Sequence, residues 1–180
     1  PLCSYFDEDK LYYNRSIIDA MSILLPEACN VELIDMIEQN QVLIESFFNS
    51  LLWRKVDSIS QNTVDRILKN IENPYFKKDI FKTFFLVASN PTNPMNANLM
   101  HKYLKDFSMK DRDVWFIPLL NDIYLDYGIN PIKRIIDWSW SDEDKSYVSD
   151  ESLLLSSIAL SWLLTTSNRK LRDNSTKALI

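Results

Sequence analysis

The sequence predicts an all-α fold, in which HEAT-like antiparallel helix pairs stack as an α-solenoid or as a compact helical array of about ten helices. Three observations favour this class. The 180 residues include a single glycine, Gly128, whereas the tight turns of all-β folds depend on glycine for positive φ. Apolar side chains recur at helical spacing along most of the chain. Short polar corners separate these stretches. We expect one helical domain over residues 1–180.

The clearest helix pair is expected in residues 150–180. Its first helix has one apolar stripe, made of Leu154, Leu155, Ile158, Ala159, Trp162 and Leu163. The polar corner 165–168 interrupts this pattern, and Asn168 is expected to cap the second helix by accepting a first-turn N–H. The second stripe consists of Leu171, Ser175, Ala178 and Leu179. A pair with one stripe on each helix cannot bury both stripes alone, so we expect it to stack on neighbouring helices.

In the first half of the chain, a helix is predicted to begin at Tyr13 and to stop at Pro26. Asn30 is expected to cap a short helix that carries Val31, Ile34 and Ile37. A longer helix follows over residues 43–55, and Arg54 and Lys55 should lie near the negative end of its dipole. Further helices are expected at 60–71, opened by Ser60, and at 76–88 after the corner at Asn73 and Pro74.

In the second half, residues 90–96 form the clearest loop, and a helix is expected over 99–107. Ser108 should cap a helix that Pro118 kinks or divides and that Gly128 ends in the left-handed conformation. Asn130 and Pro131 open a short helix as cap and first residue. Trp138, Trp140 and the acidic loop 142–145 then lead into the terminal pair.

The composition argues against most cofactor chemistry. One glycine cannot supply a Walker A loop or a dinucleotide fingerprint, both of which need several. Cys3, Cys29 and His101 are too few for an all-Cys/His zinc site, and a Cys–His nucleophile pair would need a proximity that nothing in the sequence suggests. The acidic loop lacks the spacing and the glycine of a calcium loop. We therefore expect no cofactor, no metal and no catalytic residue.

The bulk properties and the two ends of the chain give further expectations. Two cysteines fit a reducing, cytoplasmic location, and no apolar run approaches the roughly 20 residues of a membrane span. The net charge of −5 argues against nucleic acid as a partner. Pro1 is not an initiator methionine, and the sequence stops at Ile180 inside an apolar periodic pattern. We therefore expect a fragment of a longer protein, whose missing neighbour covers the last helix.

Two groups of residues are candidate partner contacts. The first is a polar ridge, Asn168, Arg169, Arg172 and Asp173, where an arginine would bind a carboxylate or phosphate of a partner. The alternative, which we favour, is that Arg172 and Asp173 pair with the adjacent repeat while Asn168 only caps. The second group is Trp138 and Trp140, because tryptophan often anchors interfaces. Burial in the core is favoured for both, as for Trp115 and Trp162.

Parts of the sequence resemble known helical proteins. Residues Leu171–Ile180, with Ser175 at the small position, resemble the second helix of a HEAT-type repeat. Residues Thr165–Ile180 together with Met109–Trp115 resemble the large bacterial STAND-type ATPases of antiviral defence. The resemblance implies a helical region outside the ATPase core of a cytoplasmic sensor that assembles on detecting a phage protein. The nucleotide-binding glycines of that family are absent, so no catalytic residue is carried over.

Three functions remain open at this point. The first is a non-catalytic helical module that binds or senses a protein partner, or contacts adjacent domains, within a larger bacterial NTPase. The second is a HEAT-like enzyme of the DNA glycosylase type, which would need a basic concave face and an acidic catalytic residue. The third is a structural spacer without a ligand. An exposed apolar or aromatic patch favours the first, a basic groove the second, and a uniformly mixed surface the third.

Overall fold

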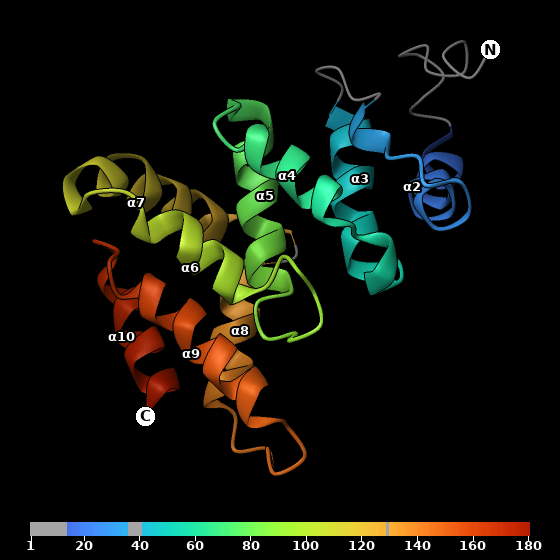
Figure 1. The fold of residues 1–180 in the computed structure, drawn as a ribbon. Coiled ribbons are helices and arrows are strands. Elements are labelled where there is room, and N and C mark those ends of the chain that lie inside the picture. Colours follow the sequence, from blue (N-terminus) through green and yellow to red (C-terminus); the bar gives the residue numbers. More distant parts are fainter. Residues whose placement is uncertain (1–13, 36–40, 129) are drawn as a thin grey trace. The chain divides into compact units, whose positions relative to one another are not determined.

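The computed structural model describes residues 14–35, 41–128 and 130–180, and every regular element in this part of the chain is helical (Figure 1). Within those residues there are nine α-helices and two short 3-10 helices, so the predicted all-α class is confirmed for them and the number of helices is close to the expected ten. The chain divides into two compact units, residues 1–80 and 81–180. The prediction of a single domain stays a prediction.

The first unit is built from helices between residues 14 and 80, and its elements are α2 (Arg15–Cys29), η3 (Leu33–Asp35), α3 (Gln41–Trp53), η4 (Val56–Ser58), α4 (Gln61–Lys69) and the first part of α5 (Pro74–Leu86). Helix α2 packs on α3 and on η3 (Figure 1). Phe47 and Phe48 of α3 are buried and lie edge to face, with ring centroids 5.1 Å apart. Phe48 also contacts Phe76 at the start of α5. The apolar stripe of α3 is therefore the centre of this unit.

A buried ion pair ties three segments of the first unit together. Arg54, directly after α3, donates two hydrogen bonds of 2.8 and 2.9 Å to the carboxylate of Glu32, and its side chain is 0% exposed. Thr63 in the first turn of α4 donates a third hydrogen bond of 2.6 Å to the same carboxylate. Arg54 follows α3 directly, at the helix end where it was expected, and its guanidinium binds this carboxylate.

Two expectations about α2 are wrong. The helix continues through Pro26 to Cys29, and Pro26 is buried in its last turn. A proline has no N–H to donate, so position 26 makes no hydrogen bond to the carbonyl four residues earlier, and the helix nevertheless continues for three more residues. Asn30 does not begin the next helix; it ends α2 in the left-handed conformation, with φ at 53°. Asparagine is the residue after glycine that most readily adopts this conformation. The expected apolar position Ile37 lies outside the described residues.

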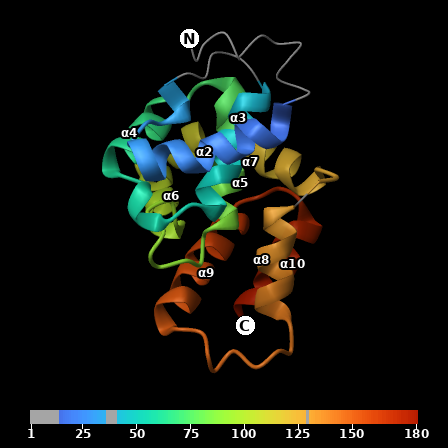
Figure 2. The same cartoon turned by 90° about the vertical axis from the view of Figure 1, so that its right-hand side faces the viewer.

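The second unit contains the end of α5 and five helices, namely α6 (Ala97–Lys105), α7 (Met109–Leu125), α8 (Pro131–Trp140), α9 (Asp150–Leu163) and α10 (Arg169–Leu179). Helix α9 packs on α10, as the sequence predicts, and also on α6. Helix α10 packs in addition on α8, and these two helices lie side by side in Figure 2. The terminal pair is thus covered by helices from earlier in the same unit.

Aromatic side chains form the core of the second unit. Phe81 is fully buried at the centre of this cluster. Its ring centroid lies 5.4 Å from Phe84, 5.6 Å from Trp115 and 5.6 Å from Phe116. Edge-to-face and tilted contacts of this kind add about 0.5–1.5 kcal/mol per pair to the burial of apolar surface. The cluster joins the end of α5 to α7.

The helix starts of this unit follow the predicted chemistry more closely than the stops. Ser108 and Asn130 accept N–H groups in the first turns of α7 and α8, as expected. Helix α7 is continuous through Pro118, so the expected division there is wrong. Helix α7 also ends at Leu125 without a left-handed glycine, because Asp126 is extended and Gly128 has no positive φ. Its C-terminal carbonyls are instead bound by Asn130, whose Nδ2 donates to Ile123 and Tyr124 at 3.0 and 2.8 Å.

Candidate functional site: two exposed faces of the second unit

The polar corner between α9 and α10 is held by its own side chains. Asn168 accepts the N–H of Leu171 at 3.1 Å, so the predicted cap is confirmed. Arg172 donates from Nη1 to the carbonyl of Thr166 at 3.3 Å, and Thr166 is buried. Arg172 is therefore directed back onto the corner of its own helix pair.

Arg169 and Asp173 of the same ridge face outward. Their side chains are 87% and 52% exposed, and Arg169 Nε lies 3.4 Å from Asp173 Oδ2, one helical turn away. An exposed pair at this spacing contributes a few tenths of a kcal/mol at most. The ridge thus separates into an inner part, which closes the corner, and an outer part, which presents charge to solvent.

Trp138 and Trp140 lie at the opposite end of the helix pair formed by α8 and α10. The Nζ atom of Lys177 is 4.9 Å from the centroid of the Trp140 ring, and that of Lys145 is 5.9 Å from the Trp138 ring. Trp138 is half-buried, but Trp140 is 51% exposed. The expectation that both are core residues is therefore wrong for Trp140, which lies in the last turn of α8, beyond the buried isoleucines of that helix.

The two predicted groups do not form one site. Lys177, which contacts Trp140, follows Asn168 by nine residues along α10, which is roughly 13 Å of helix rise. The structure joins the groups instead along one helix, with the corner at the start of α10 and the tryptophan contact in its last turn.

Helix α7 exposes an apolar stripe that the sequence analysis did not single out. Val114 is 72% exposed and Leu125 is 66% exposed, and Pro118 between them is also exposed. Positions 114, 118, 121 and 125 share one side of a helix. Asn121 in this row is half-buried and accepts a hydrogen bond of 3.4 Å from Thr166, so the exposed apolar residues lie on either side of it. The opposite side of α7 is buried through Phe116, Leu120, Ile123 and Tyr124. Helix α7 is therefore apolar on two sides but covered on one.

The same helix places two carboxylates along one edge of this stripe. Asp111 precedes Val114 by three residues, and Asp122 precedes Leu125 by three residues. Both aspartates are exposed and are three helical turns apart. The signal that could have revealed the stripe is the presence of apolar residues all around a helix, since such a helix normally has a neighbour on each side. We name Val114, Pro118 and Leu125 with this acidic edge the α7 stripe.

A further cluster joins α6, α7 and α9. The guanidinium of Arg112 lies 4.9 Å from the centroid of the Trp162 ring and pairs with Asp113 at 2.8 Å. His101 stacks obliquely against the same indole, with ring centroids 5.7 Å apart. Trp162 is half-buried. Because the guanidinium is engaged by both a carboxylate and an aromatic ring, this cluster joins helices rather than presenting a vacant cation.

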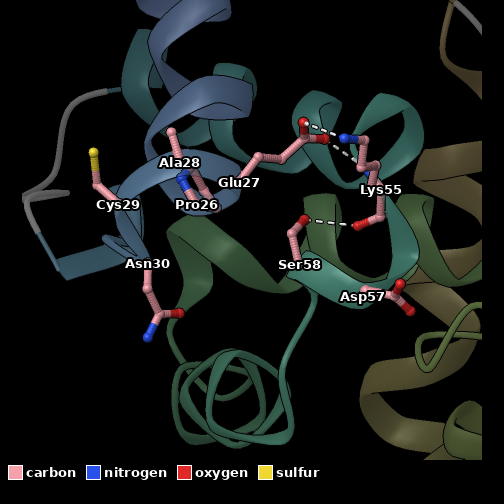
Figure 3. Close-up of a pocket in the computed structure, with 8 residues that line it drawn as sticks. All are labelled: Pro26, Glu27, Ala28, Cys29, Asn30, Lys55, Asp57 and Ser58. Atoms are coloured by element: carbon pink, nitrogen blue, oxygen red, sulfur yellow. Dashed lines mark hydrogen bonds and ion pairs between the residues drawn. The ribbon is translucent and has the colours of Figure 1, made fainter.

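A groove of about 500 Å³ lies in the first unit between the end of α2 and η4. Figure 3 shows Glu27 and Lys55 joined across it, while the Cys29 thiol points away from them. Glu27 accepts the backbone N–H of Lys55 at 2.7 Å, and its other oxygen lies 4.0 Å from Lys55 Nζ. Asp57 and Ser58 complete the polar lining. The lining has two carboxylates, Glu27 and Asp57, and one lysine, and Lys55 already contacts Glu27.

The acidic loop after α8 is organised by a local turn. Asp144 accepts hydrogen bonds of 2.9 Å from both the backbone N–H and the hydroxyl of Ser146. These bonds to the carboxylate lower the pKa of Asp144 below its ordinary value. In the described part of the chain no three histidine, cysteine or acidic side chains come together as a metal site. Cys3, one of the few soft ligands, lies outside that part.

The exposed faces described above are the features of this helical chain on which a function can be argued. Comparison with protein-family models, with curated proteins and with solved structures finds no match. Among the described helices, none has both the length and the apolar character required to cross a membrane. The chemistry of the surface is therefore the basis for the function proposed below.

Proposed function

We propose that the chain is a non-catalytic helical module that binds a protein partner, and that the partner lays an amphipathic helix along the α7 stripe. The observation that carries this proposal is the exposure of Val114 and Leu125 on a helix whose other side is already buried. An exposed apolar row of this kind lowers the solubility of the chain unless another surface covers the row.

The shape of the stripe favours a helix as the occupant. It runs roughly 16 Å from position 114 to position 125 and is one side chain wide. A second helix packed along α7 would bury such a row by interdigitating its own apolar side chains. The exposed Asp111 borders the row on one edge, so the partner helix should carry lysine or arginine beside that end of its apolar face.

We further propose that the helices belong to a HEAT-like array within a larger bacterial NTPase of antiviral defence, acting in the cytoplasm. The support is the resemblance of Met109–Trp115 and Thr165–Ile180 to such proteins, and the α9–α10 pair joined by a short polar corner. The test is the reading frame on either side of this sequence. A Walker A loop encoded in the same frame supports the proposal, and a frame without any nucleotide-binding motif contradicts it.

The partner contact is tested by photocrosslinking from defined positions. A photoreactive amino acid is placed at Val114 or Leu125 in the cells that produce the chain, and Ser157, exposed on α9, is the matched control position. We expect the same protein adduct from 114 and 125 and not from 157. The absence of adducts from positions 114 and 125, or identical adducts from all three positions, would contradict the proposal and favour a structural spacer.

A further inference from the structure

The outward surfaces of α8 and α10 differ in charge from the rest of the chain. Together these helices contain six basic and two acidic residues, although the whole sequence has 25 acidic and 20 basic residues. The basic residues are all exposed; they are Lys133, Arg134, Arg169, Lys170, Arg172 and Lys177. Lys133 lies over the ring of Tyr124 in α7, with its Nζ 5.3 Å from the ring centroid, and Arg134 lines a separate hollow beside Trp138. Arg172 bonds the carbonyl of Thr166. The cations of the outer surface are therefore Arg169, Lys170 and Lys177 of α10. We call this surface, together with Trp140, the basic face.

One end of the basic face combines a cation with an exposed aromatic ring. Lys177 Nζ is held 4.9 Å from the centroid of the Trp140 ring, which is 51% exposed. A cation over an indole leaves part of the ring available for an apolar group. Arg169 at the other end of α10 is 87% exposed, and its exposed partner Asp173 restrains it only weakly.

We propose that the basic face binds an acidic segment of a protein that also carries an aromatic residue for Trp140. Carboxylates of the segment would lie along Arg169, Lys170 and Lys177, and the aromatic residue would pack on the open part of the indole. This proposal is independent of the α7 stripe, because it concerns different helices and a partner of opposite charge.

A short acidic peptide fits the basic face better than a nucleic acid does. The basic residues of α10 lie between Arg169 and Lys177, which is roughly 12 Å of helix rise. Directly after Trp140 the chain continues into Asp142, Glu143 and Asp144, which are exposed. A nucleic acid continuing past Trp140 would bring its phosphates toward these carboxylates, whereas a peptide can end its acidic run before them.

The test measures the binding of two labelled probes to the whole chain by fluorescence anisotropy. The first probe is a twelve-residue peptide of glutamate and alanine with one central phenylalanine, and the second is a twelve-nucleotide single strand of thymidine. The test variant is Arg169→Glu with Lys177→Glu. The matched control is Lys102→Glu with Lys105→Glu, since both lysines are exposed in the last turn of α6 and the change in charge is equal.

We expect the peptide to bind, the test variant to weaken its binding at least about tenfold, and the control to change it less than about twofold. Trp140→Ala should weaken binding of this peptide but not of the same peptide with alanine in place of phenylalanine. Circular dichroism of every variant verifies that the fold is retained. The proposal is overturned if the peptide does not bind, if test and control variants weaken it equally, or if the oligonucleotide binds more tightly than the peptide.

Discussion

At the scale of single residues, Arg54 and Glu32 form a buried ion pair in the first unit. Removing charges from water is costly, and here the cost is offset by two Arg54 hydrogen bonds and one Thr63 hydrogen bond to the same carboxylate. Arg54 Nε is buried without a hydrogen-bond partner, so the compensation is incomplete. Such a pair stabilises one arrangement of its three segments rather than adding much net stability.

Arg54→Met should lower the free energy of unfolding by about 3–5 kcal/mol, because it leaves the Glu32 carboxylate buried without its counter-charge. The double variant Arg54→Met with Glu32→Leu should recover part of that loss. The matched control is Arg15→Met, which removes a pair with Glu45 whose side chains are 48% and 40% exposed. That control should cost less than about 1 kcal/mol. Urea unfolding monitored by circular dichroism measures the stability of all three variants. Equal losses of unfolding free energy in Arg54→Met and Arg15→Met would show that the buried pair matters no more to stability than an exposed one.

Asp144 gives a prediction that depends on pH. Its pKa is lowered by the two hydrogen bonds from Ser146, so the folded chain favours the ionised carboxylate. The resulting contribution to stability is present above the pKa of an unfolded aspartate and is lost as pH falls through the lower, folded pKa. Ser146→Ala should raise the pKa of Asp144 toward its ordinary value. A carboxyl NMR titration measures this, and an unchanged pKa in the variant would rule out the Ser146 hydroxyl as a cause, because alanine keeps the backbone N–H that bonds Asp144.

Residue roles were predictable where they depend on neighbours in sequence and not where they depend on distant partners. The caps Ser60, Ser108 and Asn168 were predicted because a cap bonds to an N–H two or three residues ahead. The burial of Arg54 was not predicted, because Glu32 is 22 residues away and no local pattern links them. The exposure of Trp140 likewise depends on which helix covers the end of α8.

At the scale of elements, Asn130 connects two helices with one side chain. Its Oδ1 accepts the Lys133 N–H at 2.9 Å and caps α8, while its Nδ2 binds two carbonyls at the end of α7. A side-chain amide can do both at once, because its oxygen accepts while its NH₂ group has two N–H donors. It substitutes for the glycine stop that the sequence analysis expected at Gly128.

Asn130→Ala should destabilise the chain by about 2 kcal/mol, since it removes a cap and also leaves α7 carbonyls without their donor. Ser108→Ala, which removes only the cap of α7, should cost about 1 kcal/mol. Asn130→Asp keeps the acceptor but loses the donor, so we expect an intermediate loss. Urea midpoints of the three variants provide the comparison. A loss at Asn130→Ala no larger than at Ser108→Ala would contradict the connecting role.

The positions of the helices were predicted well, because apolar periodicity is a local property of the sequence. How many sides of a helix are covered by neighbouring helices was not predicted. The expected end at Gly128 would place Tyr127 within α7, but Tyr127 lies after the helix and is fully exposed. The buried side of α7 carries Phe116 and Leu120. Val114 and Leu125 lie on the other side of α7, and periodicity alone does not say whether a second neighbour exists. The candidate contact surface could therefore be recognised only from the way whole helices pack in the structure.

At the scale of the whole molecule, the division into two compact units predicts separate local stability. Arg54→Met should raise amide hydrogen exchange mainly in α2, α3 and α4, whereas Phe81→Ala, which removes the centre of the aromatic cluster, should raise it mainly in α6 and α7. Mass spectrometry of exchanged peptides provides the measurement. If both variants accelerated exchange evenly over both units, the chain would unfold as one cooperative body and the single-domain prediction would be favoured.

The most direct test of the proposed function is the affinity of the crosslinked partner for purified chains that differ at the α7 stripe. Val114→Asp with Leu125→Asp places charge on the two exposed positions without disturbing the buried side of α7. Lys102→Asp with Lys105→Asp, on the exposed surface of α6, is the control. We predict that the stripe variant raises the partner's dissociation constant at least about tenfold and the control less than about threefold. Equal affinities of the stripe variant and the unaltered chain would contradict the account.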